Sequence, residues 1–296
     1  MKILITGATG FIGKHLTRRL LEHKYDIYSI IRKSSAKKNL DKKNIKYFID
    51  GNSIKELITF FKKERFDGVI HLASCFIVEH KSEEIADLVN SNILFSTKVL
   101  EASVITNVHW FINTGTFWQH YQNKEYSPVN LYAATKQAFE VIAKFYMETS
   151  SINFVTLKLN DTYGPGDTRP KIFNIWKKIA ENGETLVMST GEQLIDMTYI
   201  DDVIDAYIKM IELIKNDELK SFSGKSFIVS SDRLIKLKEL ADIFSKVTQK
   251  RLNINWGGKS YRKREVMMPW NKGERIPGWN PKVSFEEGMR KIFISS

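Results

Sequence analysis

Cysteine is almost absent from this sequence. Cys75 is the single cysteine among 296 residues, so no disulfide can form within the chain and no cysteine-rich metal site can assemble. Chains without disulfides are typical of reducing compartments. We therefore expect a cytoplasmic protein without a bound metal.

Long apolar runs are absent as well. No stretch approaches the roughly 18 consecutive apolar residues that a membrane-spanning helix requires. The opening apolar run, Ile3–Ile5, stops at a glycine-containing turn and is too short for a secretory signal. The sequence also has no internal repeats and no low-complexity tracts. We expect a soluble protein that does not bind a membrane.

Acidic residues are fewer than basic ones, with 34 Asp and Glu against 45 Lys and Arg and a formal net charge of +11. The basic residues are spread along the chain, with small clusters such as Arg262, Lys263 and Arg264. Neither a zinc-finger spacing nor an RNA-binding aromatic signature accompanies them, so we expect no nucleic-acid partner. The positive potential suits a phosphate-bearing cofactor and a diphosphate-bearing substrate.

What the sequence does contain is an alternation of short apolar runs with longer amphipathic stretches, typical of a parallel sheet covered by helices. The predicted strands are Ile3–Ile5, Ile27–Ile31, Ile45–Ile49, Gly68–Leu72, Val108–Asn113 and Asn153–Leu159. The helix-like segments between them are Ile12–Leu21, Ile54–Lys63, Ile85–Ala102 and Tyr132–Tyr146. Each interval between strands is long enough for a crossover helix, so parallel pairing is expected.

This alternation ends after Leu159. A turn cluster, Gly164-Pro165-Gly166-Asp167, follows, and the pattern is less regular from there on. We predict an α/β protein in which a Rossmann-type parallel sheet flanked by helices occupies residues 1–160 and roughly 196–215. In this prediction a smaller, discontinuous α/β substrate-binding domain comprises residues 161–195 and 216–296.

A glycine-rich turn follows the first predicted strand. The strand runs directly into Gly7-x-x-Gly10-x-x-Gly13 and then into an amphipathic helix. Glycines here let the backbone turn tightly and approach a pyrophosphate, while the helix N-terminus supplies amide donors and a favourable dipole. Three spaced glycines alone are weak evidence, but their position between a strand and a helix strengthens it. We predict a dinucleotide-binding turn.

The end of the second strand indicates which dinucleotide binds. NAD-binding chains usually carry an acidic residue there, which binds the ribose hydroxyls. Here the strand ends in Arg32-Lys33-Ser34-Ser35, with no acid. Two cations and two hydroxyls suit the 2′-phosphate of NADPH, and an arginine fork suits it best. We expect NADPH; the alternative is that Arg32 is an ordinary surface residue.

The next two strand ends also face this cofactor. Asp50 closes the third strand and is placed to bind the adenine edge, and His71-Leu72-Ala73-Ser74 closes the fourth. We expect His71 to be packed and hydrogen-bonded rather than catalytic.

A tyrosine and a lysine follow at helical spacing. Tyr132 and Lys136 are four residues apart, hence on one face of a helix. A nearby ammonium stabilises a phenolate and lowers the pKa of the tyrosine toward the working range of an acid-base group. This spacing alone is common by chance. Upstream, Thr114 and Thr116 place hydroxyls at the end of the fifth strand, where one can hold a carbonyl oxygen.

Together these features resemble the extended short-chain dehydrogenase/reductase family, also called the NAD-dependent epimerase/dehydratase family. Further segments in the order typical of that family are Asn92–Ala102, Tyr163-Gly164-Pro165-Gly166-Asp167, Tyr199-Ile200-Asp201-Asp202-Val203 and Gly278-Trp279-Asn280-Pro281. The resemblance implies that Thr114, Tyr132 and Lys136 form a catalytic triad. It also implies a sugar-nucleotide substrate and a homodimer formed through Ile85–Ala102 and Tyr132–Tyr146.

The residues that we expect to contact the cofactor come from the turns and strand ends above and from the family's motif positions. They are Gly7, Thr9, Gly10, Phe11, Ile12, Gly13, Arg32, Lys33, Ser34, Asp50, Gly51, Leu72, Ala73, Ser74, Asn92, Tyr132 and Lys136.

The residues after Thr114 narrow the reaction. The family's 4,6-dehydratases usually carry Asp-Glu there, whereas this chain has Gly115 and Thr116, which cannot transfer protons in that way. Its epimerases typically have an acid after the second strand, in place of Arg32. Reduction of a C4 ketone remains. The segments Asn113–Tyr121, Asn130–Glu140, Lys158–Ile172 and Arg264–Trp270 are most similar to CDP-abequose and CDP-paratose synthases, which reduce CDP-4-keto-3,6-dideoxyglucose in deoxysugar and O-antigen biosynthesis.

The resemblance implies that NADPH reduces the C4 carbonyl while Tyr132 donates a proton, Lys136 lowers the pKa of that tyrosine and Thr114 orients the carbonyl. The residues that we expect to contact the substrate are Thr116, Phe117, Trp118, Asp161, Lys171, Gln193, Arg262 and Arg264. Two positions depart from the family, since Asp161 stands in place of an asparagine and Ile195 in place of an arginine.

Two other functions stay open at this point. A sugar-nucleotide C4 epimerase would share the fold and consume no NADPH. A non-catalytic NADP(H)-sensing protein would share the scaffold, although such proteins tend to lose the catalytic tyrosine or lysine, and both are present here.

Overall fold

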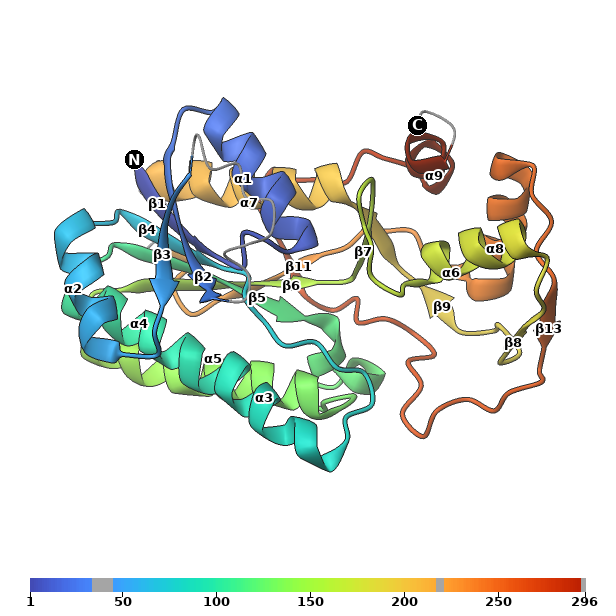
Figure 1. Ribbon diagram of the computed structural model, residues 1–296, viewed down its shortest axis with the longest axis horizontal. Coiled ribbons are helices and arrows are strands. Elements are labelled where there is room, and N and C mark those ends of the chain that lie inside the picture. The colour runs from blue at the N-terminus through green and yellow to red at the C-terminus, as the bar shows by residue number, and fades with distance from the viewer. Residues whose placement is uncertain (34–44, 217–220, 294–296) are drawn as a thin grey trace.

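A parallel sheet of eight strands organises the molecule, with the strand order β14-β11-β6-β5-β4-β1-β2-β3 (Figure 1). The computed structural model describes residues 1–33, 45–216 and 221–293. Every pair in this sheet is parallel. Its strands are β1 (Lys2–Thr6), β2 (Asp26–Arg32), β3 (Lys46–Asp50), β4 (Gly68–His71), β5 (Trp110–Thr116), β6 (Asn153–Leu159), β11 (Ser226–Val229) and β14 (Glu274–Arg275).

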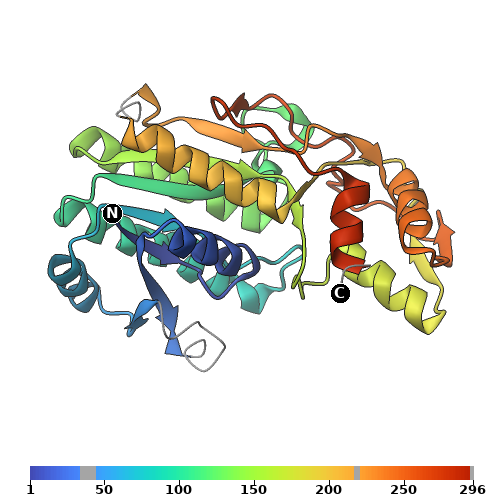
Figure 2. The same cartoon turned by 90° about the horizontal axis from the view of Figure 1, so that it is seen from above.

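Helices cover both faces of the sheet. Figures 1 and 2 show α1 (Phe11–Glu22) and α7 (Ile200–Lys215) on one face, and α2 (Ile54–Glu64), α4 (Ser96–Ile105) and α5 (Leu131–Thr149) on the other. The central strands are buried on both sides: in β1, Ile3 and Ile5 join one apolar cluster while Leu4 joins the other. The predicted α/β fold, a Rossmann-type parallel sheet flanked by helices, is thus confirmed.

The helices and short strands outside the main sheet gather at one end of the molecule, to the right in Figure 1. The helices there are α6 (Ile172–Asn182), α8 (Leu237–Thr248) and α9 (Phe285–Phe293). The strands pair as β7 (Asp161–Tyr163) with β10 (Met197–Tyr199), β8 (Leu186–Met188) with β13 (Ile254–Trp256), and β9 (Leu194–Ile195) with β12 (Ile235–Lys236). The predicted division into two domains stays a prediction, and the main sheet takes β11 and β14 from the range 216–296.

The start of α5 is fixed by a side-chain cap. The carboxamide oxygen of Asn130 accepts a hydrogen bond from the amide of Ala133 at 3.0 Å, and its nitrogen donates to the carbonyl of Val78 at 2.8 Å. Asparagine is among the best N-cap residues because it satisfies an amide that the helix itself leaves unpaired. This cap sets Tyr132 and Lys136 in the first turns of the helix.

The segment predicted as one helix, Ile85–Ala102, is divided. It contains α3 (Ile85–Val89), a π-helical turn η3 (Asn90–Phe95) and α4. Single π turns inside helices often mark functional positions. Short 3₁₀ helices lie at η2 (Ser82–Glu84), η4 (Phe117–Gln119) and η5 (Tyr121–Asn123).

In the described part of the chain, no helix has the combination of length and apolarity that spanning a bilayer demands.

Candidate active site

The glycine turn forms where β1 meets α1. Gly7 has φ of +75°, and a Cβ on it would lie 2.7 Å from the amide nitrogen of Ala73. A Cβ on Gly13 would lie 2.1 Å from the carbonyl oxygen of Gly7, so neither position accepts a side chain. The N-cap residue, Gly10, is exposed and provides no side-chain cap. The first amides of α1 are therefore placed to donate to an anion, and this geometry fits a dinucleotide pyrophosphate.

Basic and acidic groups meet beside this turn at the ends of β2 and β3. Arg32 is exposed and lies in register opposite Asp50. Lys33 is exposed as well, and the predicted contact Ser34 lies outside the described residues. A carboxylate oxygen of Asp50 accepts a hydrogen bond from the amide of Asn52 at 2.9 Å. Gly51 follows Asp50 along the chain, and the roles of these residues toward the cofactor stay predictions.

The end of β4 is tied to β1 by Thr6. Its hydroxyl accepts a hydrogen bond from the amide of Ala73 at 3.2 Å, and its carbonyl accepts one from Leu72 at 3.2 Å. His71 is fully buried between the hydroxyls of Thr6 and Ser96, each at 2.8 Å. Burial lowers its pKa well below the usual 6.5. His71 is thus packed and hydrogen-bonded, as predicted.

Asn92 in the π turn joins this strand end to α5. Its nitrogen donates to the carbonyl of Cys75 at 3.0 Å and to the hydroxyl of Thr135 at 2.9 Å. Its oxygen accepts from the amide of Cys75 at 2.7 Å and from the hydroxyl of Ser74 at 3.1 Å. These four bonds fill the capacity of a carboxamide. Asn92 therefore holds the loop that carries Ser74, and the direct cofactor contact that we predicted for it stays a prediction.

The three predicted catalytic residues line one pocket. Thr114 at the end of β5 and Tyr132 and Lys136 on α5 surround a cavity of about 780 Å³, including its open mouth. Ile12 from the glycine turn and Leu72 from the end of β4 line the same cavity. The pocket is thus continuous from the predicted dinucleotide turn to the three polar groups.

Burial controls the protonation of Tyr132, which is 9% exposed. Burial raises its pKa to about 12, while the Ser74 hydroxyl and the Arg169 guanidinium act in the opposite direction. The spacing of the sequence predicted that Lys136 lowers the pKa of Tyr132. The net direction is the reverse, because loss of solvent around the phenol outweighs the groups that favour its ionised form.

Burial acts on Lys136 in the same sense, against its charged form. It lowers the pKa of this lysine to about 8, and the carboxylate of Glu140, one helical turn further along α5, opposes the shift. Lys136 is 3% exposed. Near neutral pH the pocket therefore contains a protonated phenol next to an ammonium that is close to its titration range.

Aromatic side chains form one wall of this pocket. The ring centroids of Phe76 and Tyr132 are 4.9 Å apart, and those of Trp118 and Tyr132 are 6.5 Å apart. Phe117 and Thr116 line the same wall. Thr116 also caps η4, because its hydroxyl accepts a hydrogen bond from the amide of Trp118 at 3.3 Å. The wall offers flat apolar surface beside the hydroxyls, which suits the ring of a sugar.

A model of the NAD dependent epimerase/dehydratase family matches residues 3–222. The chain belongs to this family. The match confirms the resemblance to extended short-chain dehydrogenases/reductases that the motifs indicated.

Several relatives extend over nearly the whole chain. CDP-abequose synthase of Salmonella muenchen is 28% identical over 98% of this chain and 96% of its own length. UDP-glucuronate 4-epimerase of Thermodesulfobacterium geofontis is 27% identical over 97% of this chain and 94% of its own length. The chain is thus similar to family members that carry out different reactions.

Solved structures share the fold at lower identity. UDP-glucose 4-epimerase of Thermotoga maritima, in a complex with UDP-glucose, has a TM-score of 0.83 and 23% identity over 100% of this chain and 98% of its own. UDP-glucuronic acid 4-epimerase of Bacillus cereus, in a complex with UDP-glucuronic acid and NAD, has a TM-score of 0.83 and 23% identity over 99% and 98%. At this identity the likeness establishes the family fold alone.

Charged groups border the aromatic wall in this family member, since the ammonium of Lys171 lies 4.9 Å from the centroid of the Phe76 ring. The ammonium of Lys171 lies 2.8 Å from a carboxylate oxygen of Asp161, and both line the pocket. Arg169 lines it too, held by a two-pronged contact with Asp167 at 2.7 Å. Lys171 offsets the negative charge of Asp161, the residue that departs from the family's asparagine. With Lys136, the lining contains three cations and one carboxylate, so it favours an anionic ligand.

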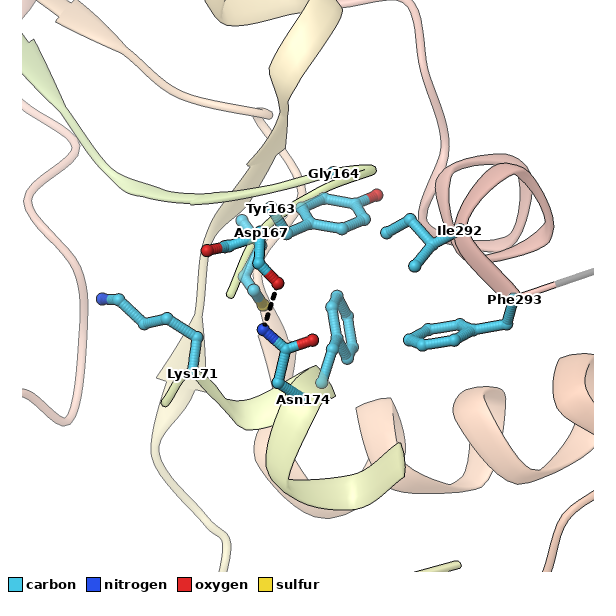
Figure 3. Close-up of a pocket in the computed structure, with 9 residues that line it drawn as sticks. Tyr163, Gly164, Asp167, Lys171, Asn174, Ile292 and Phe293 are labelled. Carbon is cyan, nitrogen blue, oxygen red and sulfur yellow. Dashed lines mark hydrogen bonds between the residues drawn. The ribbon is translucent and has the colours of Figure 1, made fainter. Parts of the chain in front are cut away.

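Lys171 also borders a second, smaller cavity of about 250 Å³ (Figure 3). Figure 3 shows it between Tyr163, Asn174 and Phe293 of α9, with the Asn174 amide donating to the carbonyl of Asp167 at 2.7 Å. Its lining is mostly apolar and contains none of the three predicted catalytic residues. Lys171 thus lines both cavities.

Three predicted substrate contacts lie outside the lining of the larger pocket. Arg262 pairs with the carboxylate of Glu265 at 2.9 Å. Arg264 donates to the hydroxyl of Ser127 at 2.7 Å and stacks on the ring of Tyr121. Gln193 is buried, and its nitrogen donates to the hydroxyl of Ser189 at 3.5 Å. Substrate contact by these three residues stays a prediction.

The sequence reasoning missed residues that the pocket does contain. Arg169 and Asn160 line it, and Tyr207 reaches Thr114 from behind. Arg169 follows a recognised turn cluster, so its charge was the available signal. Tyr207 carries a hydroxyl on the otherwise apolar face of α7, which was the signal there.

Among the described residues, no group of three or more histidine, cysteine, aspartate or glutamate side chains is arranged to hold a metal ion.

Proposed function

We propose that the protein catalyses the NADPH-dependent reduction of the C4 carbonyl of a nucleotide-diphosphate 4-keto-deoxyhexose, with CDP-4-keto-3,6-dideoxyglucose as the model substrate. The observation that carries this proposal is the meeting of Thr114, Tyr132 and Lys136 in one pocket next to the glycine turn. The similarity to CDP-abequose synthases over almost the full chain supports the choice of substrate.

The space around Gly115 argues against dehydration. A Cβ there would lie 2.9 Å from the side chains of Gln119, Lys158 and Thr156, so an aspartate at this position would have to displace these neighbours. The next residue, Thr116, uses its hydroxyl to cap η4. The site therefore lacks the acid pair that elimination of water from a sugar requires.

The geometry fits a nicotinamide dinucleotide. The uncapped start of α1 would hold the pyrophosphate, Arg32 and Lys33 would contact a 2′-phosphate, and Asp50 would face the adenine. Of these, the preference for NADPH over NADH rests on Arg32 and its neighbours. When bound, the nicotinamide supplies hydride chemistry to the pocket.

Each polar group of the pocket has a task in this reaction. Tyr132 donates its proton to the oxygen at C4; burial keeps the phenol protonated near neutral pH, the form that reduction requires. Thr114 donates a hydrogen bond to the same oxygen and shares its developing negative charge. Lys136 adds positive charge beside the phenol, so that the tyrosinate left after proton transfer is stabilised. Lys171 and Arg169 attract the diphosphate, and Phe117 and Trp118 flank the sugar.

A sugar-nucleotide C4 epimerase is the alternative, since a UDP-glucuronate 4-epimerase is similar over almost the full chain. Both reactions pass through a C4 carbonyl, so the same residues serve either. An epimerase removes a proton from the C4 hydroxyl and later returns one, so net consumption of NADPH separates the two reactions.

A panel of 4-keto sugar nucleotides, with CDP-, dTDP-, UDP- and GDP-linked members, tests the proposal. We expect one NADPH to be consumed per product, with the C4 configuration read by NMR. The Tyr132→Phe variant should lose a factor of about 10² to 10⁴ in turnover while it still binds NADPH. Interconversion of 4-epimers without net NADPH loss would establish the epimerase instead, and full turnover by Tyr132→Phe would contradict the role of Tyr132.

A further inference from the structure

A tyrosine that no motif identified lies directly behind Thr114. The hydroxyl of Tyr207 is 2.7 Å from the Thr114 hydroxyl. Tyr207 belongs to α7, on the face of the sheet opposite α5, and it is fully buried within the larger apolar cluster. Thr114 is half-buried and lines the pocket. Thr114 is therefore held between a buried phenol on one side and the pocket on the other.

The partners available to each of the two hydroxyls determine which of them donates the hydrogen bond. A buried O–H without an acceptor is unfavourable, and Thr114 is the only hydrogen-bond partner of Tyr207 among the residues that the structure describes. The phenol proton therefore points at the Thr114 oxygen. A threonine hydroxyl has one proton, and that proton cannot also lie on the line to Tyr207. It is left to point into the pocket.

We propose that Tyr207 is a positioning residue that fixes Thr114 as a hydrogen-bond donor to the oxygen on the reacting carbon. The inference deepens the proposed function and rests on it, but it holds for either C4 reaction, because a carbonyl or alkoxide oxygen accepts in both. A hydroxyl that accepts one hydrogen bond becomes a stronger donor in the next, so the phenol also strengthens the contact made by Thr114. The site thereby recognises an oxygen acceptor at C4.

The kinetic test uses Tyr207→Phe, which keeps the ring and removes the hydroxyl. Loss of a direct donor to an oxyanion costs about 10²-fold or more, and Tyr207 acts through Thr114, so we expect kcat to fall roughly tenfold with KM within about twofold. The pH dependence of kcat should keep its midpoint. Tyr199→Phe is the matched control: it removes a hydroxyl from another buried tyrosine, next to α7, and should leave kcat unchanged.

Coupling to Thr114 separates this role from a purely structural one. In the Thr114→Ala background, Tyr207→Phe should cause no further loss of kcat, whereas in the Thr114→Ser background it should again lower kcat. If Thr114 instead donates to Tyr207, the Phe variant frees its proton and kcat stays the same or rises. That result overturns the inference. So does a loss of kcat on Tyr207→Phe that is as large in the Thr114→Ala background as in the wild type.

Thermal unfolding provides a readout that needs no substrate. Thr114→Val strands the buried phenol proton and should lower Tm by about 4 °C, while adding Tyr207→Phe to that variant should restore part of the loss. If the Tm losses of Thr114→Val and Tyr207→Phe simply add in the double variant, the inference is overturned. If the wild-type protein turns over neither 4-keto sugar nucleotides nor 4-epimers, the proposed function fails. The unfolding measurements on the three variants still decide whether the two hydroxyls are hydrogen-bonded to each other.

Discussion

Lys136 is a residue of the pocket that loses its charge close to neutral pH. Burial lowers its pKa to about 8, so its ammonium loses a proton as pH rises through that value. The proposed reaction needs the charged form. We expect kcat of the wild type to fall above about pH 8, and Lys136→Arg, whose guanidinium stays charged, to move this fall to higher pH despite a lower maximum. Initial rates between pH 6.5 and 10 measure both, and an unshifted fall in the arginine variant would show that another group titrates.

Arg32 tests the cofactor preference at the same scale. Removing a charged donor to a phosphate costs about 1.5–3 kcal/mol, which corresponds to roughly ten- to hundredfold weaker binding. Arg32→Ala should therefore raise Kd for NADPH by that factor and leave Kd for NADH nearly unchanged, as measured by fluorescence titration. Arg251→Ala, at another exposed arginine, is the control and should alter neither. Equal weakening of both cofactors would remove the argument for NADPH.

At this scale, local spacing decided what could be predicted. Thr114, Tyr132 and Lys136 stand at motif positions, and the structure brings them into one pocket. The partners of Arg264 and Tyr207 lie far away in the sequence, at Ser127 and Thr114, so no local pattern reveals them. The direction of the Tyr132 pKa depends on burial, which requires the packed structure.

Among the elements, the join between β1 and α1 leaves no room for an added side chain. An added Cβ at Gly13 would lie 2.1 Å from the carbonyl oxygen of Gly7, so Gly13→Ala must displace the turn. We expect a Tm lower by several degrees and at least tenfold weaker NADPH binding, measured by scanning fluorimetry and titration. Gly183→Ala is the control: its φ is +69° with open space around it, so it should cost about 1 kcal/mol and leave NADPH binding intact. NADPH affinity that survives Gly13→Ala would contradict the assignment of this turn.

Strand and helix positions followed from the sequence more closely than their interruptions. The predicted strand Asn153–Leu159 has the observed bounds, and Ile27–Ile31 lies within β2. The π turn at Asn90–Phe95 was missed because the segment Ile85–Ala102 was predicted as one continuous helix. The pairing of the two-residue strand β14 with β11 was missed because it is set by contacts between distant segments.

The whole molecule exposes apolar side chains on its α5 surface. Val141 and Phe145 are 63% and 62% exposed, and Leu94 in the neighbouring π turn is 48% exposed. The family resemblance implies a homodimer through these segments, and covering them removes apolar surface from water. We expect a dimer by sedimentation, and a monomer after Val141→Lys with Phe145→Glu. Val187→Lys, at a valine 48% exposed outside the main sheet, should leave the dimer intact. A wild-type monomer at micromolar concentration would rule this interface out.

The position of β14 has a consequence for how the protein is made. This strand covers one edge of the main sheet, yet it comes from residues 274 and 275 of a 296-residue chain. At a synthesis rate of about 5–20 residues per second, β11 emerges from the ribosome several seconds before its neighbour exists. During that interval its open edge is available to other nascent chains. Strand β14 thus protects the edge of β11 only after nearly the whole chain has been made. Ribosomal stalling shortly before β14 would leave a product prone to aggregate.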